Sequence, residues 1–274
     1  MVKKIAERGY VFLVLALMYL PIIMVIIFSF SNTSTFSFPH GFSFEGYRSL
    51  FTEAPDKLWE SLGNTVLIAV VSSVAATLIG SVSAIGIYYM KPRGRRIVEN
   101  INQMPIVNSE IVMAVAFMLF FATFAFPNGY TRLILGHITF CTPYVVLSVM
   151  PRLMQMDPNI YEAALDLGAS PVKAMFKVVL PYILPAMLSG FAMAFTISLD
   201  DFIITQLNKG ASTGIDTLST YLYSSLRNAT GLKAYWLPAF SIIIVLVVGF
   251  VLLINLRSYK KEGSKKEKIN EKNR

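Results

Sequence analysis

The chain has 274 residues, of which 55% are hydrophobic and only 15% are charged, and its mean hydropathy is +0.59. This composition excludes an ordinary soluble domain and predicts a membrane protein. The single cysteine, Cys141, excludes an intrachain disulfide. Because His40 and His137 are the only histidines, we expect neither a structural metal site nor a redox cofactor.

Six apolar segments are long enough to cross a hydrocarbon core of about 30 Å. Because lipid offers the backbone no hydrogen-bond partner, all six are expected to be α-helices. The predicted fold class is therefore all-α, a polytopic membrane protein whose six transmembrane helices lie within residues 10–256. The predicted spans are residues 10–30, 65–89, 105–126, 133–150, 183–205 and 237–255.

The distribution of basic residues predicts the topology. About three quarters of the 24 Lys and Arg residues lie in segment 1–9, in the loops 91–103 and 151–182, and after residue 255. Since basic residues concentrate on the cytoplasmic side, both termini are predicted to be cytoplasmic. The basic tail, residues 257–274, is expected to be a disordered, solvated charge run near anionic headgroups, and no nucleic-acid partner is expected.

The second predicted span carries a small residue at every fourth position. These residues fall on one helical face, where another backbone can approach closely, so they predict a helix-packing stripe. The stripe consists of Ser72, Ala76, Gly80 and Ala84. The sequence has no G-x-x-x-x-G-K-[ST] motif to cradle nucleotide phosphates, and any ATP must therefore be hydrolysed by another chain.

Residues 157–181 lie between the fourth and fifth predicted spans, on the predicted cytoplasmic side. Asp157 suits a helix N-cap with Pro158 at the first helical position, and Ser170 with Pro171 repeats that pattern. Gly168 suits the left-handed residue just past a helix end, so two short helices are predicted to meet there. The first helix also has an amphipathic stripe suited to docking on a partner protein, made of Tyr161, Ala164, Leu165 and Gly168.

This segment resembles the EAA loop of the membrane subunits of type I bacterial ABC importers. That loop has the pattern E-A-A-x3-G-x9-I-x-L-P, and Val178 stands here in place of the usual Ile. The matching residues are Glu162, Ala163, Ala164, Gly168, Val178, Leu180 and Pro181. The resemblance implies that they couple the chain to a cytoplasmic ATPase. The residues alone also fit an ordinary amphipathic hairpin at the membrane interface.

The resemblance covers most of the chain. SLGNTVLIAV at 61–70 is similar to the start of the permease core, and GHITFCTPYVV at 136–146 and ISLDDFIIT at 197–205 resemble the second permease subunit of spermidine/putrescine importers. In that family two such subunits form the translocation path, two cytoplasmic ATPase subunits bind the EAA loops, and an extracytoplasmic binding protein delivers the substrate. The resemblance thus implies a MetI-like permease of the bacterial inner membrane, with a sister permease and no catalytic site of its own.

Three acids fall within the predicted spans, where an Asp near a helix centre costs about 2.5–3.5 kcal/mol and therefore needs a partner or a function. Asp200 and Asp201 are consecutive and point in different directions on a helix, so only one is expected to face a central path. Their charge suits a cationic substrate, although both also fit an acidic turn at the membrane interface. Glu110 fits a path residue or a first-turn acid equally well. His137 is expected to be a hydrogen-bond donor at the interface, with a proton relay as the alternative.

The favoured interpretation is a six-span permease subunit of an ABC importer for polyamines. An importer for iron, thiamine, a phosphonate or a sugar remains an alternative. A channel or ion-coupled carrier would transport substrate without an ATPase. An intramembrane enzyme is a further alternative, but the sequence has neither an H-E-x-x-H nor a G-x-S-x-G motif.

Overall fold

The structure is a computed structural model that describes residues 2–30, 41–53, 56–210, 213–228, 235–245 and 248–249. The chain divides into two compact units, which are described separately. The first unit comprises Met1–Trp59 and Leu222–Gly249, and the second comprises Glu60–Tyr221 and Phe250–Arg274. The predicted basic tail, residues 257–274, lies outside the described residues.

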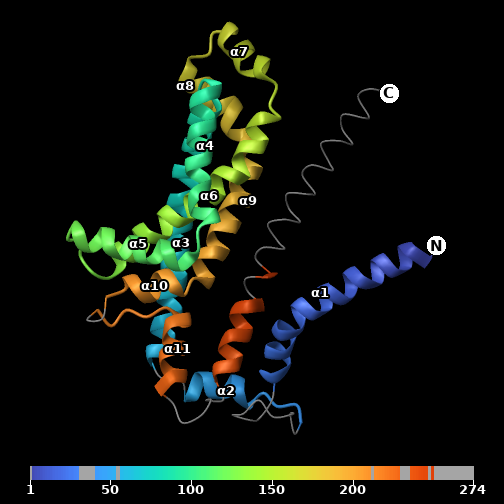
Figure 1. The fold of residues 1–274 in the computed structure, drawn as a ribbon, viewed down its shortest axis with the longest axis vertical. Coiled ribbons are helices and arrows are strands. Elements are labelled where there is room, and N and C mark those ends of the chain that lie inside the picture. Colours follow the sequence, from blue (N-terminus) through green and yellow to red (C-terminus); the bar gives the residue numbers. More distant parts are fainter. Residues whose placement is uncertain are drawn as a thin grey trace. The chain divides into compact units, whose positions relative to one another are not determined.

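The described elements are helices, which confirms the predicted all-α class for this part of the chain (Figure 1). The longer helices are α1 (Val2–Phe28), α3 (Asp56–Tyr88), α4 (Pro92–Val107), α5 (Glu110–Thr123), α6 (Tyr130–Met154) and α9 (Leu180–Asp200). The shorter elements are α2 (Glu45–Thr52), α7 (Pro158–Asp166), α8 (Pro171–Ala174), the π-helical turn η1 (Met175–Val179), α10 (Ile203–Asn208) and α11 (Leu218–Asn228).

The described residues do not confirm the predicted number of six membrane spans. Within the part of the chain that the structure describes, four helical stretches are long and apolar enough to cross a membrane, and α4 and α5 together would make a fifth if they count as one bent span. These four are Gly9–Phe28, Asp56–Tyr88, Tyr130–Met154 and Pro171–Asp200. The sixth predicted span, residues 237–255, is described only in part, as the helix Trp236–Val245 and residues 248–249, so the count of six is not confirmed.

The third predicted span, residues 105–126, is wrong as a single helix. It is divided between α4 and α5, which meet at an angle of 104°. Asn108 and Ser109 have extended backbones, with ψ angles of 149° and 137°, and therefore end one helix before the next begins. The segment 91–103, expected to be a loop, lies mostly within α4.

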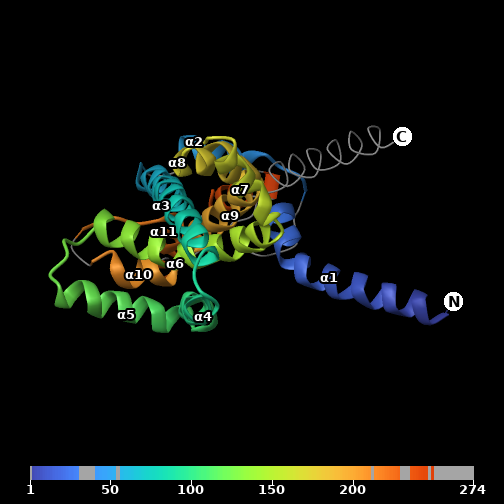
Figure 2. The same ribbon diagram turned by 90° about the horizontal axis from the view of Figure 1, so that it is seen from above.

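In the second unit α3, α6 and α9 run side by side, and α5 and α10 lie against each other and across these three helices (Figures 1 and 2). The predicted small-residue stripe of α3 is buried. It faces α6, because the Ser72 hydroxyl donates to the Ile134 carbonyl at 3.4 Å and Gly80 lies against Val145. The core between these helices includes Cys141, which is fully buried.

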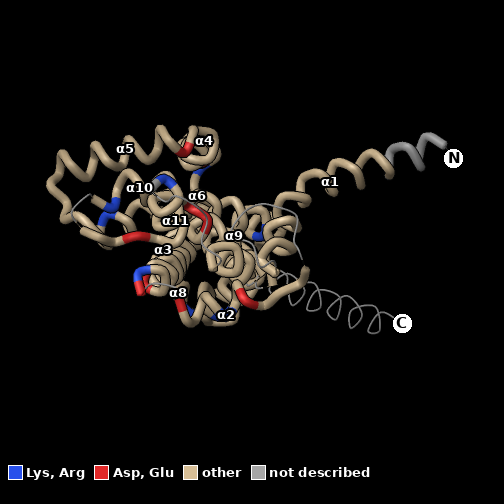
Figure 3. Tube along the Cα trace, turned by 90° about the horizontal axis from the view of Figure 1, so that it is seen from below, with Lys and Arg blue, Asp and Glu red and all other residues tan. Residues whose placement is uncertain are grey.

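Charge is sparse along the apolar helices of both units. In Figure 3 the described traces of α1 and α5 are tan for most of their length. Many of their large apolar side chains are exposed in the isolated chain, among them Phe12 at 75% and Leu119 at 58%. Such surfaces suit a lipid environment or contact with another membrane subunit.

The first unit contains α1, α2 and the helix Trp236–Val245. Four aromatic rings pack together where α1 ends and α2 begins, with centroid distances of 5.0 to 6.4 Å. These rings belong to Phe30, Phe42, Phe44 and Tyr47. The Tyr47 hydroxyl also lies 2.8 Å from Ser29 Oγ and donates to Ser241 Oγ at 3.3 Å, so it joins the helices of this unit.

Candidate functional site

The EAA segment, residues 157–181, contains the two short helices that the sequence predicts, and they lie at one end of the second unit (Figure 1). Before α7, the Asp157 side chain accepts a hydrogen bond from the Asn159 amide at 3.0 Å. Before α8, the Ser170 hydroxyl accepts one from the Lys173 amide at 3.4 Å. Both predicted N-caps are confirmed, and each such cap contributes about 1 kcal/mol to helix stability.

Gly168 forms the joint between these helices. Its φ of +82° is the left-handed conformation that glycine adopts without steric cost. The amide of Gly168 bonds to the Leu165 carbonyl at 2.9 Å, and the amide of Ala169 bonds to the Ala164 carbonyl at 3.1 Å. These two bonds are the pair that defines a Schellman motif. The predicted helix end at Gly168 is therefore confirmed.

The amphipathic stripe of α7 packs in part on the chain itself. Tyr161 contacts the hydrophobic core, and its ring centroid lies 5.9 Å from that of Tyr89. Ala164 and Leu165 are half-buried. The outward surface of the EAA segment is instead formed by other apolar side chains, of which Leu167 is 89% exposed. The exposed apolar side chains of the segment are Ile160, Leu167, Val172 and Phe176.

The residues of the EAA pattern are distributed over both helices and the run that follows them. Glu162 and Ala163 are exposed on α7, and Ala164 is half-buried beside them. Val178 lies in the π-helical turn η1, Leu180 begins α9, and Pro181 is exposed. The π-helical turn was not predicted. Such turns are rare and occur frequently at functional sites, because they insert an extra residue into a helix.

The three acids proposed from sequence lie close together in the second unit. Asp200 is the last residue of α9, Asp201 follows it, and Glu110 is in the first turn of α5. Glu110 is close enough to both Asp201 and Asp200 for their carboxyl groups to interact electrostatically. Glu110 is an acid in the first turn of α5, which is one of the two interpretations that the sequence left open. This cluster concentrates negative charge where ammonium groups could be bound.

The two aspartates have different environments. Asp200 is exposed and Glu110 is half-buried, whereas Asp201 is only 5% exposed. The carboxylate of Asp201 accepts hydrogen bonds from the amides of Ile204 and Thr205 at 3.2 and 2.9 Å, and therefore caps the start of α10. Asp201 is therefore a buried helix cap. The predicted fifth span, residues 183–205, ends early at Asp200, because Asp201 has an extended backbone with ψ of 130°.

His137 lies in the same cluster, where its side chain is buried within the chain and hydrogen-bonded. The side chain is 1% exposed. Its Nδ1 lies 2.7 Å from Ser198 Oγ, and its Nε2 lies 3.1 Å from Thr205 Oγ1 and 3.4 Å from Asp201 Oδ2. The Thr205 hydroxyl donates to the same Asp201 oxygen at 2.8 Å. Residues from α6, α9 and α10 are thus joined in one buried polar cluster.

A second polar network fixes the segment that follows α10. The side-chain amide of Asn64 in α3 donates through Nδ2 to the Asp216 backbone carbonyl at 3.0 Å. The Tyr130 hydroxyl donates to Oδ1 of the same side chain. The Lys209 ammonium forms an ion pair with the Asp216 carboxylate, and both side chains are largely buried. These contacts attach Asp216, and through it Lys209, to Asn64 of α3.

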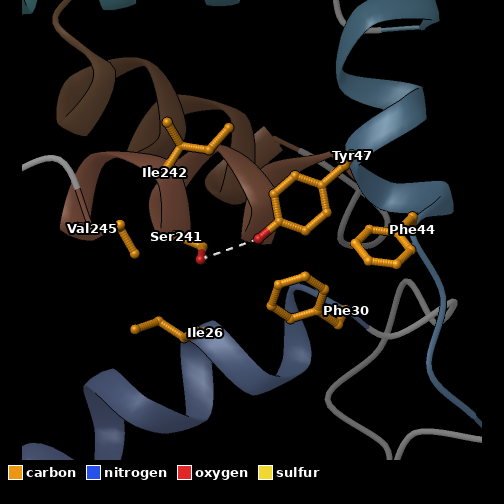
Figure 4. A pocket seen from close by; sticks show the side chains of 7 residues that line it. All are labelled: Ile26, Phe30, Phe44, Tyr47, Ser241, Ile242 and Val245. Carbon is orange, nitrogen blue, oxygen red and sulfur yellow. Dashed lines mark hydrogen bonds between the residues drawn. The ribbon is translucent and has the colours of Figure 1, made fainter.

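The first unit has a mostly apolar pocket with a volume of about 480 Å³, in contrast to the acidic cluster of the second unit. Figure 4 shows its seven lining side chains, of which only Tyr47 and Ser241 are polar, and these two are hydrogen-bonded to each other. The lining residues are Ile26, Phe30, Phe44, Tyr47, Ser241, Ile242 and Val245. Because none of them is charged, this pocket offers no ion pair to a charged ligand.

Ser198 and Thr205 were not proposed as functional residues from the sequence. One signal was present, because Asp201 and Thr205 are four residues apart and Ser198 is three residues before Asp201. The break between α9 and α10, which turns these side chains toward His137, could not be inferred from an apolar run. Among the described residues, no group of three or more His, Cys, Asp or Glu side chains is arranged to hold a metal ion.

Comparisons with a protein family and with individual relatives both identify components of transport systems. Residues 76–259 match the family described as "Binding-protein-dependent transport system inner membrane component". The spermidine/putrescine transport system permease protein PotC of Haemophilus influenzae is 34% identical over 254 residues, which cover 93% of this chain and 96% of that protein. The putrescine transport system permease protein PotI of Escherichia coli is 31% identical over 250 residues, with coverage of 89% and 86%.

Solved structures support the fold. The crystal structure of a bacterial ABC transporter that imports the polysaccharide alginate contains a chain that matches with a TM-score of 0.69. The match covers 92% of this chain and 95% of that chain, at 18% sequence identity. At this identity the likeness establishes the fold alone.

Proposed function

This chain belongs to the family of inner membrane components of binding-protein-dependent transport systems, and we propose that it is a permease subunit of a polyamine importer. It forms the path for spermidine and putrescine together with a sister permease. By their names, the relatives that are 31 to 34% identical over most of the chain are permease proteins of a spermidine/putrescine and a putrescine transport system, which supports the polyamine substrate class here.

The observation that carries the substrate assignment is the convergence of Glu110, Asp200 and Asp201 from two helices into one cluster. Polyamines carry several ammonium groups, and each binds best to a carboxylate in a charge-assisted hydrogen bond. Asp200 is the acid that meets the substrate, because it is exposed while the oxygens of Asp201 are already hydrogen-bonded. Glu110 lies beside it as a second acid.

The EAA segment couples this path to ATP hydrolysis. Its exposed apolar side chains, with Leu167 most prominent, are suited to a groove on a cytoplasmic ATPase subunit. The helical run Pro171–Asp200 begins in this segment and ends at Asp200. A displacement of α8 by the ATPase is therefore carried along one helix to the acid cluster. Gly168 allows the sharp bend that presents both short helices to the partner.

The proposed function also implies an orientation in the membrane and a set of partner subunits. The EAA segment and both termini face the cytoplasm, as the distribution of Lys and Arg predicts. An extracytoplasmic binding protein delivers the polyamine to the opposite side. The chain has no catalytic site of its own, and partner ATPases hydrolyse the ATP.

Uptake by cells that lack or express this chain tests the proposal. Cells that express it with its partner subunits should accumulate labelled spermidine, and unlabelled putrescine should compete. Thiamine, a ferric complex, a phosphonate and maltose, as chemically different competitors, should have no effect. Spermidine uptake that is equal with and without the chain would contradict the polyamine assignment.

A further inference from the structure

The polar cluster around His137 lies at the break between α9 and α10. Helix α9 ends because Asp201 is extended, and α10 begins because the Asp201 carboxylate caps it. Asp200 is the residue immediately before this break, so a change in the backbone at Asp201 would also move the Asp200 side chain. A group that fixes Asp201 therefore also fixes Asp200.

The hydrogen-bond pattern assigns a role to each atom of the cluster. The Thr205 hydroxyl donates its proton to Asp201 Oδ2, so its oxygen can only accept from His137 Nε2. Nε2 therefore carries a proton and is directed at both Thr205 Oγ1 and Asp201 Oδ2. On the other side of the ring, Nδ1 is bound to the Ser198 hydroxyl at 2.7 Å. The imidazole is thus held at both nitrogens, which fixes its orientation.

Helices α6 and α9 are also held together by contacts away from the His137 cluster. Gly190 lies against Val145, and the Ser148 hydroxyl donates to the Ala186 carbonyl at 3.0 Å. Several buried side chains of both helices also share one hydrophobic core. The His137 cluster is consequently not required to hold the two helices together, and its loss should act locally, at the end of α9.

We infer that His137 is a positioning residue for substrate recognition. Through Thr205 and Asp201 it fixes the break after α9 and so holds the Asp200 carboxylate where a cationic substrate meets it. His137 itself does not contact the substrate, because it is almost completely buried. The inference rests on the proposed function, in which Asp200 is the acid of the path.

The test uses the whole transporter in proteoliposomes, with its ATPases, sister permease and binding protein. It measures labelled spermidine transported per ATP hydrolysed. His137→Leu should lower this ratio by about tenfold, the effect of one charge-assisted hydrogen bond, while basal ATP hydrolysis stays within about twofold of the wild type. His137→Gln keeps an amide donor near the position of Nε2 and should restore at least half of the ratio.

A second variant serves if His137→Leu reduces the amount of protein in the membrane. Thr205→Val removes the hydroxyl between His137 and Asp201 and should lower the ratio in the same way. Thr142→Val is the matched control, because Thr142 is a half-buried residue of α6 whose hydroxyl donates to Ile138 of its own helix at 2.7 Å. The control should transport like the wild type.

A double-variant cycle separates this role from general damage. If His137 acts through Asp200, His137→Leu combined with Asp200→Asn should be no worse than Asp200→Asn alone. Effects that multiply would overturn the inference. A normal ratio in both His137→Leu and Thr205→Val, with a reduced ratio in Asp200→Asn, would also overturn it but leave the proposed function intact. A normal ratio in Asp200→Asn would contradict both.

Discussion

A β-carbon built on Gly80 of α3 would lie 2.8 Å from the Cβ of Val145 in α6, a separation that real β-carbons essentially never show. The same valine contacts α9, because a β-carbon on Gly190 would lie 3.2 Å from its Cγ1. Val145 is fully buried between the two glycines. The helices α3 and α9 are thus both packed against one residue of α6.

Gly80→Val should therefore destabilise the bundle. Added carbons at this position force α3 away from α6, and such overpacking costs about 1–3 kcal/mol. Gly86→Val is the matched control on the same helix, because no atom lies within 4 Å of a β-carbon there. Thermal unfolding in detergent should show a lower midpoint for Gly80→Val than for Gly86→Val. Equal midpoints would show that close packing at Gly80 is not needed.

Gly168→Val should weaken the association with the ATPase. A side chain at a left-handed residue costs about 1–2 kcal/mol, so the joint between α7 and α8 opens. Gly168→Asn is the control, because asparagine tolerates this conformation better than other residues. Copurification of the ATPase with each variant measures the effect. Because no atom lies within 4 Å of a β-carbon added at Gly168, a steric clash does not contribute to the result. If both variants retain the ATPase equally, the bend at Gly168 does not matter for docking.

Leu167→Ser should reduce ATPase binding without changing insertion into the membrane. The side chain is 89% exposed in the isolated chain, so its loss removes partner contact and leaves the fold unchanged. Burial of a leucine in a partner groove contributes about 1.5–3 kcal/mol, which is at least a tenfold change in affinity. Leu167→Met keeps the apolar volume and should bind almost normally. Unimpaired binding by Leu167→Ser would place the docking surface elsewhere.

Lys209→Met should destabilise the segment after α10. The substitution leaves the Asp216 carboxylate largely buried without its ammonium partner, and breaking such a pair costs about 3–5 kcal/mol when burial is complete. Arg95→Met is the control, because Arg95 and Glu99 form a more exposed pair within one helix, of the kind worth about 0.3–0.5 kcal/mol. Limited proteolysis around residues 209–217 should be faster in Lys209→Met alone. Equal proteolysis rates in the two variants would argue against a structural role for the Lys209 pair.

Local sequence patterns predicted the local structure well. Proline, glycine and capping residues specify short helices through contacts a few positions apart, so the two N-caps and the bend at Gly168 of the EAA segment are confirmed. The small-residue stripe of α3 was predicted correctly for the same reason, since its spacing places every member on one helical face.

Breaks within apolar segments could not be predicted in this way. Hydropathy measures the length of an apolar run but not its direction, so neither the 104° bend before Glu110 nor the end of α9 at Asp200 was visible. Both breaks lie at residues with extended backbones, and an apolar run does not show which of its residues are extended. The position of His137 follows from the second of these breaks, and it was consequently missed.

The most direct test of the central claim is polyamine transport by the purified, reconstituted importer. Proteoliposomes that contain this chain, its sister permease and the ATPases should accumulate labelled spermidine when binding protein and ATP are supplied. Liposomes with this chain alone should accumulate none, and Asp200→Asn should lower the rate of the full complex by about tenfold. Spermidine uptake without ATPase, or an ATP-dependent complex that rejects spermidine and putrescine, would contradict the account.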